Sequence, residues 1–228
     1  MTAHPADLLA TLARLDTPTI CNALERLDPA RSGFGFTRRP LICSHPDAGP
    51  RVGYARTAKI RTTPPQGEDK EALTARRFAY FDYVNAGDGP KIAVHQDLDG
   101  DEGIAACWGD VMANLHKAMG CVGVVTNGAF RDIPGMPEGI PMLAAGEKPA
   151  HGFLHMIAFG EPVEVAGMTV RDGDLLHMDR NGAVVIPAAL APALPEAALQ
   201  VVEREQRVIA LCRAPDFSLE RVKAAMRG

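Results

Sequence analysis

The chain has 228 residues, a formal net charge of −4 and 46% hydrophobic residues, which is enough apolar material for a real core. It has no run of Lys and Arg, so a nucleic-acid partner is not expected, since phosphate binding needs a clustered basic surface. No window of about 18 apolar residues predicts a membrane span. The first 15 residues lack the pattern of a signal peptide. We expect a single domain over residues 1–228.

The cysteines are five, an odd number, and none stands in a Cys-x-x-Cys pair. This pattern favours reduced thiols and a cytoplasmic protein over disulfides or a zinc site. Buried cysteines that act as small hydrophobes are the simplest interpretation.

The first half of the chain alternates predicted helices and strands. Apolar spacing, turn residues and capping signals predict helices over 6–15, 17–27, 69–84 and from 109–110 to about 119. The second of these begins with Thr17 as its N-cap and Pro18 as its first helical residue, and ends at about Leu27. Strands are predicted over 41–43, 53–62, 91–95 and 121–126. The order strand, helix, strand predicts a right-handed parallel crossover.

The second half is predicted to consist mainly of β-hairpins followed by one long helix. A short strand over 140–143 precedes two predicted hairpins, over 163–170 and 175–186, the second with Asn181-Gly182 as its turn. A long helix is predicted over 188–211. These elements predict one mixed α/β fold with C-terminal hairpins and a C-terminal helix.

Gly109 and Asp110 stand where a strand ends and a helix begins. The first N–H groups of a helix have no internal partner and carry the positive end of its dipole, so they can receive a carboxylate. The alternative is that Asp110 is only a helix N-cap, a position where Asp is favoured.

Arg131 and Asp132 follow the strand over 121–126 after Asn127-Gly128. Ligands of open parallel sheets bind outside the carboxyl ends of strands. A guanidinium there can hold a 2-oxo acid in a bidentate manner, and one carboxylate with waters can hold Mg²⁺. The alternative is a surface ion pair between neighbours, which contributes about 0–1 kcal/mol. The acidic run from Asp97 to Glu102 lacks the glycine and distal glutamate of an EF-hand.

The motif Gly109-Asp-x-x-x-Ala113, Gly120-x-x-Gly123, Gly128-x-x-Arg131-Asp132 closely resembles the signature of the RraA-like family. That family includes the 4-hydroxy-4-methyl-2-oxoglutarate / 4-carboxy-4-hydroxy-2-oxoadipate aldolases, which also decarboxylate oxaloacetate. The opening, residues 17–24, and the closing segments, 173–179 and 182–187, are similar too.

The resemblance implies a compact β/β/α fold in trimers or hexamers, with active sites between subunits. It implies Mg²⁺ or Mn²⁺ held by Asp132 largely with waters, a 2-oxo acid oriented by Arg131, and a metal-bound water held by Asp110. The backbone next to Gly109, at Val111, Met112 and Ala113, is implied to receive the substrate carboxylate. A glutamate from the C-terminal helix of a neighbouring subunit is implied to approach the metal; Glu205 fits best and Glu203 second.

Two departures from the family pattern are visible. Asn22 stands where Asp is common, and the segment 147–155 differs, so that His151 and His155 are candidates for contacts with a distal carboxylate. The leading hypothesis is a metal-dependent carbon–carbon lyase that yields pyruvate by retro-aldol cleavage, oxaloacetate decarboxylation or both. The alternative is a non-catalytic binding protein that modulates a ribonuclease, because fold does not fix function.

Overall fold

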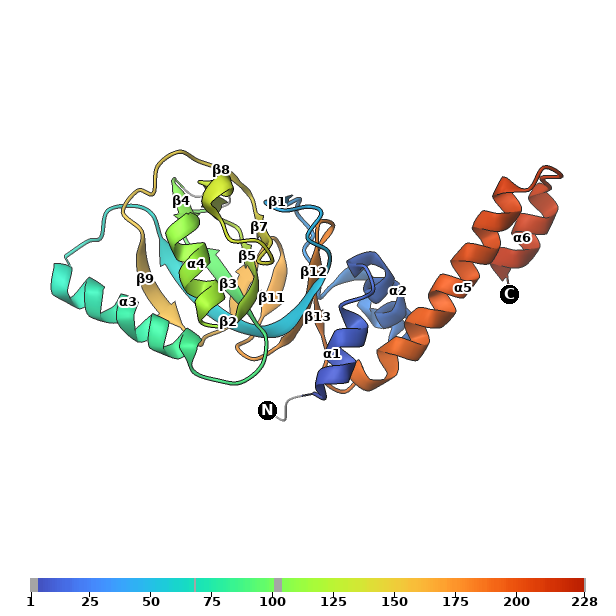
Figure 1. Ribbon diagram of the computed structural model, residues 1–228, viewed down its shortest axis with the longest axis horizontal. Helices are drawn as coiled ribbons and strands as arrows, with labels where there is room; N and C mark the ends of the chain where they lie inside the picture. The colour runs from blue at the N-terminus through green and yellow to red at the C-terminus, as the bar shows by residue number, and fades with distance from the viewer. Residues whose placement is uncertain (1–3, 68, 101–103, 228) are drawn as a thin grey trace.

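A mixed, curled β-sheet forms the centre of the molecule (Figure 1). The structure is a computed structural model that describes residues 4–67, 69–100 and 104–227. In that part of the chain the sheet order is β1-β7-β5-β3-β2-β12-β13, and β9 pairs with the far half of β2. The strands are β1 (Ile42–Cys43), β2 (Arg51–Arg61), β3 (Lys91–Asp97), β5 (Cys121–Thr126), β7 (Met142–Ala144), β9 (His155–Phe159), β12 (Leu175–Asp179) and β13 (Gly182–Ile186).

Strands β2, β3, β5 and β7 run parallel, so the predicted parallel pairing of the strands before and after the 109–119 helix is confirmed. A second, smaller parallel sheet lies beside them, in the order β4-β6-β8. Its strands are β4 (Ala106–Trp108), β6 (Ala129–Phe130) and β8 (Gly146–Glu147), and a separate hairpin joins β10 (Val163–Val165) to β11 (Met168–Val170). Both predicted hairpins are present.

Six α-helices are present in the described part of the chain, and those that pack on the central sheet fall into two groups (Figure 1). They are α1 (Ala6–Leu12), α2 (Thr17–Leu27), α3 (Lys70–Asn85), α4 (Asp110–Ala118), α5 (Leu194–Arg213) and α6 (Leu219–Arg227). Helices α3 and α4 share one core with β2, β3, β5 and β7, whereas α1, α2 and the start of α5 pack in another core against β12 and β13. The β10–β11 hairpin contributes to a third core with residues of the central sheet.

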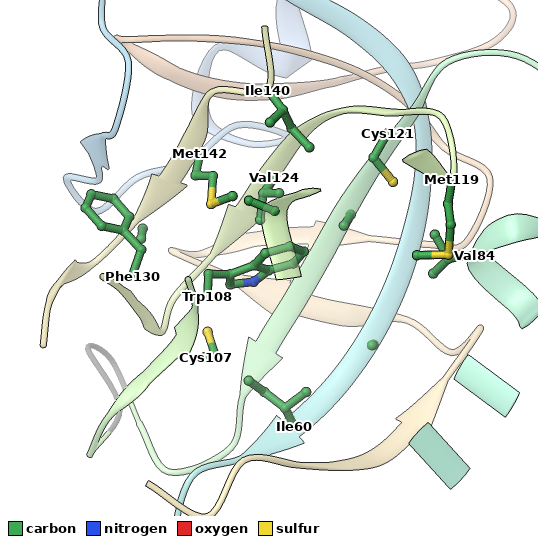
Figure 2. Packing of buried hydrophobic residues seen from close by; sticks show 14 of the residues in the cluster. Ile60, Val84, Cys107, Trp108, Met119, Cys121, Val124, Phe130, Ile140 and Met142 are labelled. Atoms are coloured by element: carbon green, nitrogen blue, oxygen red, sulfur yellow. The ribbon is translucent and has the colours of Figure 1, made fainter. Parts of the chain in front are cut away.

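Trp108 lies in the middle of the first core, between Phe130, Val124 and Met142 (Figure 2). Its side chain is 1% exposed. Because Trp108 immediately precedes Gly109, this packing fixes the point at which the chain leaves β4 and enters α4.

The cap of α2 corrects the sequence analysis. Asp16, not Thr17, is the N-cap, and its carboxylate accepts from the amide of Thr19 at 2.8 Å. Thr17 is the first helical residue, and its amide donates to Asp179 Oδ2 at 2.8 Å while its hydroxyl contacts His177 Nδ1 at 2.9 Å. The opening and closing segments of the family motif therefore meet in space, and their role at this point is to join α2 to β12.

Helix α5 begins at Leu194 rather than at residue 188. A short 3₁₀ turn, Ala191–Ala193, precedes it, and Pro195 occupies its first turn. Proline lacks an amide donor and suits a helix start rather than an interior. Beyond its first two turns α5 extends away from the sheet, together with α6, which the sequence analysis did not predict (Figure 1).

Candidate functional site

The candidate site lies where two neighbouring strands of the small sheet end. Strands β4 and β6 are parallel, with Trp108 opposite Phe130, so Gly109 and Arg131 leave the same edge. The amide of Arg131 donates to the carbonyl of Trp108 at 2.9 Å. The structure thus brings together the two motifs that the sequence analysis placed at strand exits.

Gly109 is needed here because of close approach. A Cβ at this position would lie 3.0 Å from Asp132 Oδ2 and 3.4 Å from Arg131 Nε. Its φ of −146° is ordinary extended backbone, so the constraint is space and not strain. A side chain at position 109 would push the carboxylate and the guanidinium away from the start of α4.

Asp132 adopts a left-handed backbone conformation, with φ 58° and ψ 34°. Such a conformation is uncommon for a residue other than glycine and costs about 1–3 kcal/mol, which is typical of functional positions. It starts a short turn in which the amide of Gly135 donates to the carbonyl of Asp132 at 2.9 Å. A Cβ on Gly135 would lie 3.0 Å from Asp110 Oδ2, so the turn presses against the Asp110 side chain and places both carboxylates beside it.

The guanidinium of Arg131 is held by two contacts. Nε pairs with Asp132 Oδ2 at 3.1 Å, and one Nη donates to the carbonyl of Pro149 at 3.2 Å. The side chains of Arg131 and Asp132 are 33% and 43% exposed, so a solute can reach both. The ion pair expected under the alternative interpretation does form, but at this exposure it contributes little stability.

The first turn of α4 offers fewer amides than the resemblance implies. The amide of Val111 donates to Asp110 Oδ1 at 2.7 Å, and that of Ala113 donates within the helix to the carbonyl of Gly109 at 3.0 Å. The predicted contact of Ala113 with a substrate carboxylate therefore has no donor in this structure. Within the described ranges, the amides of Asp110 and Met112 have no acceptor. Gly109, and not Asp110, is the N-cap, so the alternative role of Asp110 as a cap is wrong.

Glu205 belongs to α5, and α5 extends away from the sheet and from α4 (Figure 1). Its Oε1 accepts from Asn22 Nδ2 at 3.0 Å. The pair lines a groove of about 620 Å³ between α2, α5 and α6. A single chain thus does not bring Glu205 to Arg131, and Glu203 is an exposed residue of the same helix.

The two histidines of the divergent segment differ. His151 is exposed and its Nδ1 contacts the carbonyl of Gly152, whereas His155 is buried at the start of β9 and contacts the carbonyl of Phe153 at 2.7 Å. From the same segment, the carbonyl of Pro149 contacts the candidate site by accepting from Arg131.

A buried carboxylate was missed at the carboxyl end of β3. Asp97 is 2% exposed and burial raises its pKa to about 6. The side-chain amide of Asn127 binds the backbone of Asp97 twice: its oxygen accepts from the Asp97 amide, and its nitrogen donates to the Asp97 carbonyl. The sequence pattern excluded a calcium loop here but gave no sign of burial, because Asp97 follows a strand whose depth only the tertiary fold defines.

Metal-ligand clusters and membrane helices are not found in the part of the chain that the structure describes. No group of three or more His, Cys, Asp or Glu side chains is arranged to hold a metal. None of the described helices has the length and apolarity needed to cross a bilayer.

The fold and this edge define a mixed α/β protein with an acidic and guanidinium-bearing site at adjacent strand ends. The family profile described as "RraA-like: Aldolase/RraA" matches residues 17–185, and the chain belongs to this RraA-like family.

Two relatives named as putative aldolases are similar to this chain. A protein of Halalkalibacterium halodurans named "Putative 4-hydroxy-4-methyl-2-oxoglutarate aldolase" is 27% identical over 194 residues, covering 82% of this chain and 80% of that protein. A Marinomonas protein of the same name is 36% identical over 89 residues, 38% of this chain and 55% of that protein.

Solved structures share the fold. Streptomyces coelicolor RraAS2, described as an unusual member of the RNase ES inhibitor RraA protein family, has a TM-score of 0.69 at 24% identity, covering 90% of this chain and 97% of that one. An uncharacterized Pseudomonas syringae protein gives a TM-score of 0.72 at 24% identity, covering 98% and 95%. These likenesses confirm the predicted fold class.

Proposed function

We propose that this protein is a divalent-metal-dependent lyase that cleaves a carbon–carbon bond of a 2-oxo acid and releases pyruvate. The reaction would be retro-aldol cleavage, decarboxylation of oxaloacetate, or both. The observation that carries the proposal is the convergence of Arg131, Asp132 and the first turn of α4 around Gly109, where a Cβ would crowd both side chains. The name of the 27% identical relative supports the same class of substrate.

Each residue has a role that its contacts support. Arg131 is anchored by Asp132 and Pro149, and its remaining N–H groups would hold the 2-oxo acid. The free amides of Asp110 and Met112 would receive the substrate carboxylate at the positive end of α4. Asp110 Oδ1 is engaged by Val111, so Oδ2 is the oxygen that would accept and return a proton.

The bond that breaks is β to the 2-oxo carbonyl. Its electron pair moves into the carbonyl and leaves the enolate of pyruvate, which then takes a proton at carbon. Both reactions share this step. In retro-aldol cleavage the departing fragment also loses its hydroxyl proton, to Asp110 Oδ2 in this proposal, and leaves as an oxo compound; the same proton can return to the enolate carbon. In decarboxylation carbon dioxide leaves with no proton to remove, and the enolate takes its proton from water. One site could therefore serve both.

Asp132 is the proposed ligand of Mg²⁺ or Mn²⁺. Its Oδ2 faces Arg131, while Oδ1 has no partner among the described residues, and the side chain is 43% exposed. A single accessible carboxylate suits a cation that keeps most of its waters. When bound, the cation would supply Lewis-acid stabilisation of the developing negative charge.

We also propose that the site is completed in a homo-oligomer, a trimer or a hexamer. Asn22 holds the Glu205 carboxylate on a helix that extends away from its own sheet. The Glu205 carboxylate of one subunit, or that of Glu203, would approach the Arg131 site of a neighbouring subunit. The proposal rests on the family resemblance together with the exposed position of α5.

The test is release of pyruvate from oxaloacetate with added Mg²⁺. We expect turnover that excess chelator abolishes and that restored Mg²⁺ or Mn²⁺ recovers. Arg131→Ala serves as the matched control for spontaneous, metal-promoted decarboxylation in solution. If the wild type and this variant release pyruvate at the same rate, the lyase proposal fails for this substrate, and screening of 4-hydroxy-2-oxo acids with the same pair decides the retro-aldol arm.

A further inference from the structure

A fully buried polar network lies beneath the candidate site. Tyr80 of α3 places its hydroxyl 2.6 Å from His95 Nε2 of β3 and 2.7 Å from His116 Nε2 of α4. All three side chains are at most 1% exposed. His116 continues the network, because its Nδ1 lies 2.8 Å from the carbonyl of Met112, in the first turn of α4.

The protons of this network have one consistent arrangement. Burial lowers the pKa of His116 to about 4 and lowers the pKa of His95 well below its ordinary range, so both rings are neutral near pH 7. The Met112 carbonyl can only accept, so His116 carries its proton on Nδ1 and accepts the Tyr80 hydroxyl on Nε2. The Tyr80 oxygen then accepts from His95 Nε2–H.

This donor direction, from His95 toward α4, agrees with the surroundings of His95 Nδ1 at the far end of the network. It leaves His95 Nδ1 as a bare lone pair, and that atom is buried without a partner among the described residues. The opposite direction would bury an N–H group with no acceptor at the same place, and orphaned donors are rare in native proteins. The hydrogen bonds therefore run from His95 through Tyr80 and His116 to α4.

The chain of hydrogen bonds continues through the backbone to the site. The Met112 carbonyl that His116 contacts belongs to the same peptide group as the amide of Ala113. That amide donates to the carbonyl of Gly109 at 3.0 Å, and the Gly109 carbonyl shares a peptide group with the free amide of Asp110. Consecutive hydrogen bonds polarise one another, so each donor along the chain becomes stronger.

We propose that Tyr80 is a positioning residue: through His116, Met112 and Gly109 it orients and polarises the Asp110 amide that receives a carboxylate. The identity of that ligand rests on the proposed function. The network itself does not, since it is defined by contacts within the protein. Tyr80 would thus act on substrate affinity from a place that no substrate touches.

Removal of one hydroxyl tests the proposal. In Tyr80→Phe we expect pyruvate, measured with Mg²⁺ present, to bind about threefold more weakly, and the Asp110 amide proton to shift upfield in the ligand-free protein. The matched control is Tyr83→Phe, one turn further along α3, where the hydroxyl contacts Asp172 and the amide of Thr57 instead. The control should leave both measurements unchanged.

Two substitutions of His116 separate polarisation from support of the fold. Asn places its amide nitrogen near the position of Nδ1 and can still donate to Met112, whereas Gln places it near Nε2 and cannot. We expect His116→Asn to retain more pyruvate affinity and more of the Asp110 shift than His116→Gln. Nitrogen-15 spectra of the wild type should show His116 protonated at Nδ1 and His95 at Nε2.

The outcomes are distinct. An unshifted Asp110 amide in Tyr80→Phe, or the opposite tautomers, overturns the proposed network whatever the protein binds. If Tyr80→Phe shifts the Asp110 amide proton but the wild-type protein binds no pyruvate, the network stands and only the proposed function is contradicted. Equal losses in His116→Asn and His116→Gln overturn the polarising role.

Discussion

The sheet edge that carries Arg131 and the arm formed by α5 and α6 are built on different principles. At the sheet edge, Trp108 and the parallel strands β4 and β6 fix every candidate group from within one chain. In the arm, the buried residues of α5 are confined to Leu194, Ala197 and Ala198 among the described positions, and Ile209 is 45% exposed. The groups of the first region are held by contacts within one chain, whereas the second presents exposed apolar and acidic groups, for which we propose a role in a neighbouring subunit.

The largest effect is expected at the sheet edge. Asp132→Ala should lower metal-dependent turnover more than about a hundredfold, since loss of a ligand should exceed the 10–100-fold typical of its outer-shell partners. The fold should persist, because Asp132 is exposed. Calorimetry of Mg²⁺ and Mn²⁺ binding provides the check. Unchanged metal affinity would contradict the assignment of Asp132.

Arg131→Lys should lower kcat/KM for oxaloacetate about tenfold to a hundredfold although the charge is kept. A lysine ammonium is a point donor and cannot both bond the Pro149 carbonyl and present a planar fork to a 2-oxo acid. Steady-state kinetics measure the loss, with far-ultraviolet circular dichroism as the control for folding. A variant as active as the wild type would rule out the guanidinium clamp.

The arm is tested by changing both of its candidate acids. Glu203→Gln combined with Glu205→Gln should lower turnover about tenfold and change the free energy of unfolding by only about 0.5 kcal/mol, because both residues are exposed. Mixed with Asp132→Ala under subunit exchange, this variant should regain turnover, since some interfaces would combine two intact halves. Sedimentation that shows a fully active monomer would remove the distinction between the two regions.

Gly109→Ala should have a smaller, local effect. The added Cβ would meet Asp132 Oδ2 at 3.0 Å and Arg131 Nε at 3.4 Å, so these groups must shift by a few tenths of an ångström. We expect turnover to fall about threefold to tenfold, or roughly 1 kcal/mol. The matched control is Gly33→Ala, where a Cβ would meet nothing within 4 Å. Equal activity of both variants would show that crowding at Gly109 does not matter.

The smallest effect is on stability, at Asp97. Burial raises the pKa of this carboxyl to about 6. A hydrogen bond from the Asp99 amide lowers the pKa, the charge of Asp99 raises it, and the Thr62 hydroxyl and Arg61 lower it. Because the folded pKa lies above 3.8, the folded state binds the proton more tightly, and stability is lost as pH rises toward about 6. Relative to wild type, Asp97→Asn should therefore gain about 1 kcal/mol of stability as the pH rises from about 5.5 to about 7.5. Urea denaturation at both pH values measures this, and a pH-independent difference would refute it.

Sequence patterns predicted most where the structure depends on residues close together in the chain. They placed Gly109 and Arg131 at strand exits, and the structure confirms this. Arg131 follows β6 and not the strand over 121–126, and neither β4 nor β6 was predicted. The left-handed Asp132, the engaged amide of Ala113 and the start of α5 at Leu194 could not be predicted, since each depends on neighbours brought together by tertiary packing. The network of Tyr80, His95 and His116 joins three separate elements and leaves no spacing pattern. The single-domain organisation and the role of Glu205 stay predictions.

The most direct test of the central claim is a crystal structure of the protein with Mn²⁺ and pyruvate. Anomalous scattering locates the metal without reference to activity, and the ligand's orientation identifies its donors. We predict a Mn²⁺ peak bound to Asp132, the pyruvate carboxylate at the amides of Asp110 and Met112, and Arg131 at the 2-oxo group. Mn²⁺ bound elsewhere, or pyruvate outside the Gly109 turn at saturating concentration, would contradict the account.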